Sequence, residues 1–276
     1  MVPVLTPLTA KQTVDEQSLR QLLRYLIDGG VHGLFIAGTA GLGSILATKE
    51  YERLVAIALD EVGQVLPLLF GVLEPSTARA QERLSLIEAL GAKAFVAVPP
   101  YYCRATTHAQ MLRHFGALRE KSSLEMVIYN IPICTNVSIP IEIMIEMTTL
   151  GWISACKDSS GDAEYFRALC SAGGKVGLRV YQGMRPDFGE LHALSAAGCV
   201  PVPANVFPEQ FANAWNERAE ESHRAAHQAV CDAAWESLVR PNDFTGRSIA
   251  ALAERGIGDG TRSLPFSMDD EILSPT

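Results

Sequence analysis

Short apolar runs alternate along the chain with longer segments whose apolar positions recur at helical spacing. Apolar runs bounded by turn residues predict buried strands, and amphipathic segments predict helices that cover a sheet. The predicted strands are Val2–Thr6, Gly33–Ala37, Leu66–Gly71, Ala94–Val98, Met126–Asn130, Ile153–Asp158, Arg179–Gly183 and Cys199–Val202. The predicted helices include Glu16–Asp28, Lys49–Asp60, Thr77–Leu90, Thr107–Lys121 and Pro140–Leu150.

This alternation predicts an α/β fold in which every strand is followed by a helix. Eight such units close a (β/α)8 TIM barrel. A helical pattern continues from about Glu209 to Arg255, although the last strand of a barrel needs only one helix. We therefore predict a catalytic barrel over residues 1–208 and, over residues 209–276, a C-terminal helical extension packed on the barrel.

Charge and cysteine spacing exclude several classes of protein. The chain of 276 residues has 23 basic and 31 acidic residues and a net charge of −8, which argues against a nucleic-acid partner. No apolar stretch is long enough to span a bilayer. The 6 cysteines form no Cys-x-x-Cys pair, so we expect free thiols, no zinc site, no disulfide framework and a cytoplasmic location.

Lys157 ends one of the predicted buried strands and is followed by a turn. Desolvation of an ammonium group disfavours its charged form and leaves a better amine nucleophile. Such an amine suits Schiff-base formation with a carbonyl substrate. The alternative is a strand-end lysine whose charge reaches solvent or pairs with Asp158 or Asp162.

Catalytic groups of TIM barrels lie at the C-terminal ends of the strands. Here these positions carry Lys157, a glycine-bracketed Thr39, the phenol of Tyr129 and the pair Tyr101-Tyr102. Pro99-Pro100 stiffens the chain before that pair and is expected to aim both tyrosines outward. Phenols transfer protons, a threonine hydroxyl relays them, and backbone N–H groups of a glycine-rich turn hold a carboxylate. The set suits carbonyl chemistry on a keto acid.

Several of these segments together resemble the dihydrodipicolinate synthase / N-acetylneuraminate lyase family of pyruvate-dependent class I aldolases. The similar segments are Gly38-Thr39-Ala40-Gly41, Pro100-Tyr101-Tyr102, Tyr129-Asn130-Ile131-Pro132, Lys157-Asp158-Ser159-Ser160-Gly161-Asp162, Tyr181-Gln182-Gly183 and Gly198-Cys199-Val200. They occur in order and cover nearly the whole chain. Each segment alone is weak evidence for the resemblance, but six segments in the right order and spacing are strong evidence.

The resemblance implies roles for individual residues. Lys157 forms the imine with pyruvate or a 2-oxo acid, Tyr129 is the general acid and base, and Thr39 relays protons and contacts the carboxylate. Tyr102 enters the active site of a neighbouring subunit, so a homodimer or homotetramer is implied. No cofactor and no metal are expected. The residues expected to bind substrate are Thr39, Ala40, Gly183, Val200, Cys134 and Ser159.

Departures from the family pattern bear on the substrate. Synthases of the family carry an arginine two residues after the proline of Tyr-Asn-x-Pro, where it binds a substrate carboxylate, and this position is Cys134 here. A thiol cannot replace a bidentate guanidinium. The glycine turn, with Ala40 and Leu42, looks more like that of 2-keto-3-deoxygluconate aldolases. We expect a 2-keto-3-deoxy sugar acid aldolase that joins or releases pyruvate and an aldehyde. The alternatives are a 4-hydroxy-tetrahydrodipicolinate synthase and a catalytically degenerate barrel that binds a keto acid.

His223 and His227 stand four residues apart near Glu220. This spacing places both imidazoles on one face of a helix and is compatible with a metal pair. The sequence shows no third ligand motif beside them, so a solvated helix face is the favoured interpretation.

Overall fold

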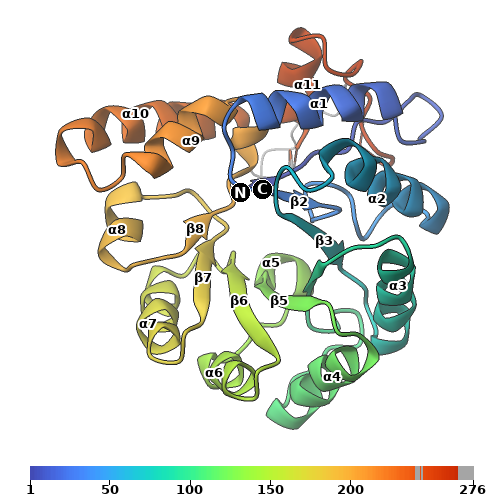
Figure 1. Ribbon diagram of the computed structural model, residues 1–276, viewed down its shortest axis with the longest axis vertical. Coiled ribbons are helices and arrows are strands. Elements are labelled where there is room, and N and C mark those ends of the chain that lie inside the picture. Colours follow the sequence, from blue (N-terminus) through green and yellow to red (C-terminus); the bar gives the residue numbers. More distant parts are fainter. Residues whose placement is uncertain (240–242, 244, 267–276) are drawn as a thin grey trace, which may run out of the picture. The chain divides into compact units, whose positions relative to one another are not determined.

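The computed structural model describes residues 1–239, 243 and 245–266 and contains an eight-stranded sheet in the order β1-β2-β3-β4-β5-β6-β7-β8 (Figure 1). β1 pairs with β2, and β3 to β8 pair in chain order, all in parallel. The strands are β1 (Val2–Pro3), β2 (Leu34–Ile36), β3 (Leu68–Val72), β4 (Ala94–Ala97), β5 (Glu125–Asn130), β6 (Ile153–Asp158), β7 (Arg179–Gln182) and β8 (Gly198–Cys199).

Helices separate the strands and continue after the last one. They are α1 (Glu16–Asp28), α2 (Thr48–Val62), α3 (Thr77–Ala89), α4 (His108–Lys121), α5 (Pro132–Thr135), α6 (Ile141–Thr149), α7 (Ala163–Gly174), α8 (Phe188–Ala193), α9 (Pro208–Asn216), α10 (Glu221–Leu238) and α11 (Gly246–Glu254), with a short 3-10 helix η1 (Val202–Asn205). Every predicted strand and helix is present; most ends differ by one or two residues, and the first and last strands are shorter than predicted. Within the described residues no helix is long and apolar enough to cross a membrane; a cytoplasmic location stays a prediction.

The first and last strands are shorter than predicted because other partners take over their backbone groups. Val4 N–H still donates to the Phe35 carbonyl, at 2.9 Å. Leu5 N–H then donates to the side-chain oxygen of Asn205, at 3.0 Å, so strand pairing stops before Thr6. At the last strand, Pro201 has no N–H to donate and the chain enters η1.

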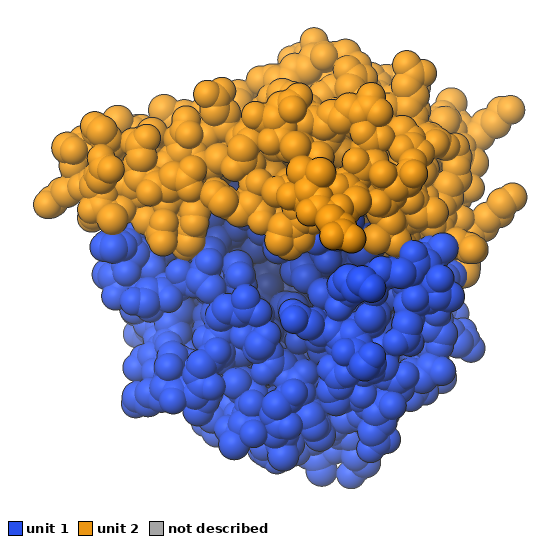
Figure 2. Space-filling model, viewed as in Figure 1, with its two compact units in different colours: residues 1, 68–201 blue, residues 2–67, 202–276 orange. Residues whose placement is uncertain are grey.

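The chain forms two compact units (Figure 2). Unit 1 consists of residue 1 and residues 68–201, and unit 2 consists of residues 2–67 and 202–276. Unit 1 therefore holds β3 to β8, whereas unit 2 holds β1, β2 and the helices after η1. The division into a barrel over 1–208 and an extension over 209–276 stays a prediction, and residues 240–242, 244 and 267–276 of that extension lie outside the described residues.

Unit 1 has an apolar core between its strands and helices. All residues of β4 and five of the six residues of β5 and of β6 are buried, as expected for parallel strands covered on both faces. Large aromatic side chains fill the remaining space. Those fully buried in this unit are Phe70, Phe95, Phe115, Phe166 and Phe188.

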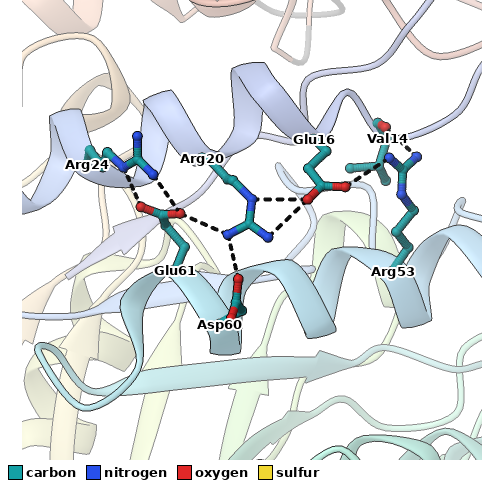
Figure 3. A network of polar contacts seen from close by, with 7 residues as sticks. All are labelled: Val14, Glu16, Arg20, Arg24, Arg53, Asp60 and Glu61. Carbon is teal, nitrogen blue, oxygen red and sulfur yellow. Dashed lines mark hydrogen bonds and ion pairs between the residues drawn. The ribbon is translucent and has the colours of Figure 1, made fainter.

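In unit 2 an ionic network joins α1 to α2 (Figure 3). Arg20 of α1 contacts Glu16 at 3.0 Å, Asp60 at 2.7 Å and Glu61 at 2.9 Å. Arg24 binds the same Glu61 carboxylate. Because one guanidinium serves three carboxylates, these charges act as a network rather than as isolated surface pairs, which contribute little to stability.

His114 is buried where α4 contacts α3 and the end of β4. Its Nε2 lies 3.1 Å from the Val98 carbonyl and its Nδ1 lies 2.9 Å from the Thr77 hydroxyl. A carbonyl only accepts, so Nε2 carries the proton and Nδ1 accepts from Thr77. Burial lowers the pKa of His114 to about 4. The imidazole is therefore neutral in the folded protein.

This buried imidazole predicts a loss of stability in weak acid. The pKa of His114 is about 4 in the folded protein and 6.5 for an ordinary histidine, so the unfolded chain binds the proton first as the pH falls. The free energy of unfolding should thus decrease between pH 6.5 and pH 4, by up to roughly 3 kcal/mol. Urea denaturation at several pH values measures it. His114→Gln should reduce this slope, whereas His192→Ala, which removes an exposed imidazole of the same unit, should keep it.

Candidate active site

β5 and β6 bring Tyr129 and Lys157 together. The register of the two parallel strands sets these residues directly opposite each other. The Lys157 Nζ lies 4.2 Å from the centroid of the Tyr129 ring. Both side chains are buried, with 7% and 3% of their surface exposed for Lys157 and Tyr129. The alternative in which the lysine charge simply reaches solvent is therefore wrong.

Ser159 is the third polar side chain of this group. Its hydroxyl donates to the Tyr129 hydroxyl at 3.4 Å. Its backbone N–H donates to the Asn130 carbonyl at 2.8 Å, which extends the pairing of the two strands beyond Lys157. An amine, a phenol and an aliphatic hydroxyl thus lie within one buried group in unit 1.

Gly183 borders this group at the end of β7. A β-carbon there would lie 2.0 Å from Ser159 Oγ and 2.5 Å from Lys157 Cε. Its N–H donates to the Asp158 carbonyl at 2.7 Å, which fixes the backbone in place. A side chain at this position would therefore displace the side chains of Lys157 and Ser159, and the missing side chain leaves the space that the lysine occupies.

A cluster of polar side chains that includes Asp158, the residue after Lys157, joins the C-terminal ends of β5 and β6. The Asn130 amide donates to Asp158 Oδ1 at 2.8 Å and accepts from Ile139 N–H at 3.1 Å. The Ser160 hydroxyl donates to Asp158 Oδ2 at 2.8 Å. Burial raises the pKa of Asp158, and its hydrogen bonds oppose that effect. From the sequence, Asn130 had no expected role and Asp158 was considered only as a charge partner of Lys157, although both belong to the similar segments.

Asp162, the other carboxylate considered as a partner for Lys157, begins the next helix. Its side chain accepts from Tyr165 N–H at 3.0 Å and caps the N-terminus of α7. Capping by an aspartate stabilises a helix through an otherwise unpaired backbone donor. The turn after Lys157 is therefore fixed at both ends, by the Asp158 cluster and by this cap.

Cys134 lies on the short helix α5, which follows β5. Its side chain is exposed. Partial burial raises the pKa of the thiol, and the positive charge of Lys157 acts in the opposite sense. The thiol is therefore close enough to Lys157 for that charge to affect it.

The two tyrosines after β4 differ in their surroundings. Tyr102 has 88% of its surface exposed, as predicted. Tyr101 is half-buried, and its hydroxyl donates to the Leu73 carbonyl at 3.4 Å. Burial raises its pKa. The prediction that both tyrosines point outward is wrong for Tyr101, because a carbonyl inside the unit is available to its hydroxyl.

Thr39 and Ala40 belong to unit 2 and lie on its glycine turn. Ala40 is buried and Thr39 is partly exposed. The turn is tight: a β-carbon at Gly43 would lie 1.8 Å from the Ala37 carbonyl oxygen. The Thr6 hydroxyl donates to the Gly41 carbonyl at 2.7 Å. The conformation of this turn thus depends on its glycines.

Val200, the last of the expected binding residues, is buried beside β8. Its N–H donates to the Gln182 carbonyl at 2.8 Å. The N–H groups of both Val200 and Gly183 are therefore used in strand pairing. Any backbone contact between these two residues and a substrate must use other backbone atoms. The structure groups Lys157, Tyr129, Ser159 and Gly183 directly, with Cys134 within the influence of the lysine charge.

Comparison with known proteins identifies the family. A model of the dihydrodipicolinate synthetase family matches residues 1–245. A 4-hydroxy-tetrahydrodipicolinate synthase of Methanothermobacter thermautotrophicus is 30% identical over 220 residues, which are 79% of this chain and 77% of the relative.

Solved structures agree with this match. A dihydrodipicolinate synthase of Acinetobacter baumannii, crystallised with pyruvate, has a TM-score of 0.87 at 26% identity and covers 98% of this chain and 92% of its own. A monomeric dihydrodipicolinate synthase variant has a TM-score of 0.90 at 24% identity over 98% of this chain and 91% of its own, which confirms the TIM-barrel fold. The chain belongs to the dihydrodipicolinate synthetase family and is a class I, pyruvate-dependent aldolase or lyase.

Proposed function

We propose that this enzyme cleaves 2-keto-3-deoxy sugar acids into pyruvate and a hydroxyaldehyde, or joins these two products. The observation that supports the proposal is Cys134, which stands where the synthases of the family carry an arginine. Its neutral thiol lies within the influence of the Lys157 charge. A substrate tail that meets a thiol instead of a guanidinium should itself be uncharged, as the hydroxyls of a sugar acid are.

In the proposed cleavage, Lys157 Nζ attacks the substrate carbonyl carbon, and loss of water gives a protonated imine. Tyr129 then takes the proton of the C4 hydroxyl. The C3–C4 bond breaks, the aldehyde leaves, and the bonding electrons pass into the iminium as an enamine. Protonation of C3 and hydrolysis release pyruvate and restore the amine. The 4.2 Å between Nζ and the Tyr129 ring supports a shared role at one substrate.

The other expected residues keep the roles that the resemblance implies. Thr39 relays protons and contacts the substrate carboxylate, which the backbone N–H of Ala40 helps to hold. Ser159, bonded to the Tyr129 hydroxyl, contacts a substrate hydroxyl. Gly183 and Val200 line the imine pocket. Each of these roles is a proposal for which single substitutions provide the test.

The proposal predicts that pyruvate is released from one or more members of a panel of 2-keto-3-deoxy sugar acids. Pyruvate plus aspartate semialdehyde should condense poorly. Cys134→Arg should raise the semialdehyde reaction and lower the sugar-acid reaction, because it supplies the missing cation. Ile133→Arg adds the same charge one residue away, on a side chain that is 86% exposed. It should change the rate of neither the semialdehyde reaction nor the sugar-acid reaction. Coupled assays of pyruvate measure both reactions for the wild type and for each of the two variants.

The second candidate is a 4-hydroxy-tetrahydrodipicolinate synthase, which is favoured by the names of relatives such as the Methanothermobacter protein. In that case another cation, such as Arg104 or Arg185, takes the place of the missing arginine. Efficient condensation of aspartate semialdehyde by the wild-type enzyme, with no release of pyruvate from any sugar acid, would establish this candidate and reject the first.

We also infer that the enzyme is a homodimer or homotetramer in which Tyr102 enters the site of the neighbouring subunit. The 88% exposure of this aromatic side chain supports the inference, because large exposed aromatics are typical of interfaces. Mixing inactive Tyr102→Phe with inactive Lys157→Ala should restore part of the activity, since a mixed dimer can hold one intact site. One of the similar solved structures is a monomeric dihydrodipicolinate synthase variant. If the present enzyme were a monomer with full activity, a shared site would be contradicted.

A further inference from the structure

A cluster of metal-ligand side chains lies in unit 2, where α9 ends and α10 begins. Glu217, Glu220 and His223 each offer a ligand atom, and these atoms all lie within 4.8 Å of one another. His227 is not part of this group of mutually close atoms, but it contacts one member, since its Nε2 lies 2.9 Å from Glu217 Oε2. We propose that these four residues bind a first-row divalent transition-metal ion of the zinc type.

The donor atoms converge in a way that suits such an ion. Glu217 Oε2 lies 3.0 Å from His223 Nδ1 and 2.9 Å from His227 Nε2. Glu220 Oε2 lies 3.2 Å from the same His223 Nδ1. Ligands of a tetrahedral zinc ion, each about 2.0–2.2 Å from the metal, are separated by roughly 3.3 Å. Small side-chain rotations would therefore open these contacts enough to admit the ion.

The chemistry of the donors also selects this class of ion. Two imidazoles and two carboxylates form a mixed nitrogen and oxygen set, which suits zinc, nickel and copper better than magnesium or calcium. On binding, each imidazole would keep its proton on the ring nitrogen that faces away from the metal.

The backbone holds the four residues in place before any ion arrives. His223 and His227 lie one turn apart on α10, so both face the end of α9, which runs beside α10 in Figure 1. Glu220 N–H donates to the Glu217 carbonyl at 2.9 Å. The Arg224 Nε donates to the Arg218 carbonyl at 2.9 Å and ties the connection to the helix. Such prior ordering reduces the entropy lost on binding.

This proposal departs from the expectation of a solvated helix face without a metal. The sequence showed two histidines and Glu220, but it lacked a further ligand at a recognisable spacing. Glu217 supplies it from the end of the preceding helix, and only the turn between α9 and α10 brings its carboxylate to both imidazoles. An ion bound here would link α9 and α10, two helices that lie far from Lys157 in the sequence.

Zinc titration of the metal-free protein, followed by calorimetry or by competition with a chromophoric chelator, tests the proposal. The wild-type chain should bind one zinc ion per chain at this site. His223→Ala/His227→Ala should lower the affinity by at least about tenfold, and zinc should raise the melting temperature of the wild type but not of this variant. Both imidazoles are partly exposed, with 57% and 26% of their side-chain surface accessible, so the double variant should fold normally, as circular dichroism would show.

Two controls separate this site from other zinc ligands. His108→Ala removes an exposed histidine that pairs with Glu146 at 2.6 Å, and it should bind zinc like the wild type. Cobalt substitution reports thiolate ligands, such as the exposed Cys103 and Cys134, through a charge-transfer band that should be absent. The proposal is overturned if the double histidine variant binds as much zinc as the wild type, or if the bound cobalt shows thiolate ligation.

Discussion

Lys157→Ala will eliminate the covalent adduct with pyruvate and lower turnover by about 10⁴-fold or more, as loss of a covalent nucleophile does in other enzymes. The physical reason is that the amine is buried against Tyr129, with its Nζ 4.2 Å from the ring. In that position the amine is proposed to form the imine on which every later step depends. No other described lysine is buried.

Borohydride reduction in the presence of pyruvate provides the measurement. Mass spectrometry of the wild-type protein should find one reduced pyruvyl group, and peptide mapping should place it on Lys157. Lys175→Ala, which removes an exposed lysine of the same unit, should keep both the adduct and the activity. An adduct that survives Lys157→Ala would mean that another amine carries the reaction, and an unmodified wild type would favour a barrel without turnover.

Tyr129→Phe is expected to leave the fold intact and to lower kcat by roughly 10²–10⁴-fold, the usual contribution of a positioned acid or base. The substitution keeps the ring that packs against Lys157 and removes only the hydroxyl, which accepts from Ser159 at 3.4 Å. Imine formation should therefore be slowed less than cleavage. Comparison of the rate of borohydride trapping with the rate of pyruvate release separates the two steps.

The matched control for this variant is Tyr165→Phe. The Tyr165 hydroxyl donates to the Ile139 carbonyl at 2.6 Å and is structural. Its loss should lower the melting temperature while turnover per folded molecule stays near that of the wild type. A Tyr129→Phe enzyme with wild-type kcat would show that the Tyr129 hydroxyl has no part in proton transfer.

The order of strands and helices could be predicted from the sequence because buried parallel strands leave short apolar runs between amphipathic segments. The ends of β1 and β8 could not. Leu5 N–H bonds to Asn205, a residue far along the chain, and no local pattern shows that partner. The short helix α5 could not be predicted either, because its four residues are too few to show a helical period.

The candidate site, too, could be predicted only in part. Lys157 and Tyr129 could be placed at strand ends from sequence, but their proximity depends on register. An irregularity between Met126 and Val127 shifts that register and sets Tyr129 opposite Lys157. A shift of one residue would turn the tyrosine to the other face of the sheet. The contact of Glu217 with both histidines likewise depends on a turn that the sequence does not specify.

Gly183 has a practical consequence for anyone who wishes to alter the aldehyde selectivity of this enzyme. Even the single methyl group of alanine would meet Ser159 Oγ at 2.0 Å and Lys157 Cε at 2.5 Å. A mutant library should therefore leave this position unchanged and place its diversity at Cys134, whose side chain is exposed. New side chains on α5 can then explore different substrate tails while the lysine keeps the space that it needs to react.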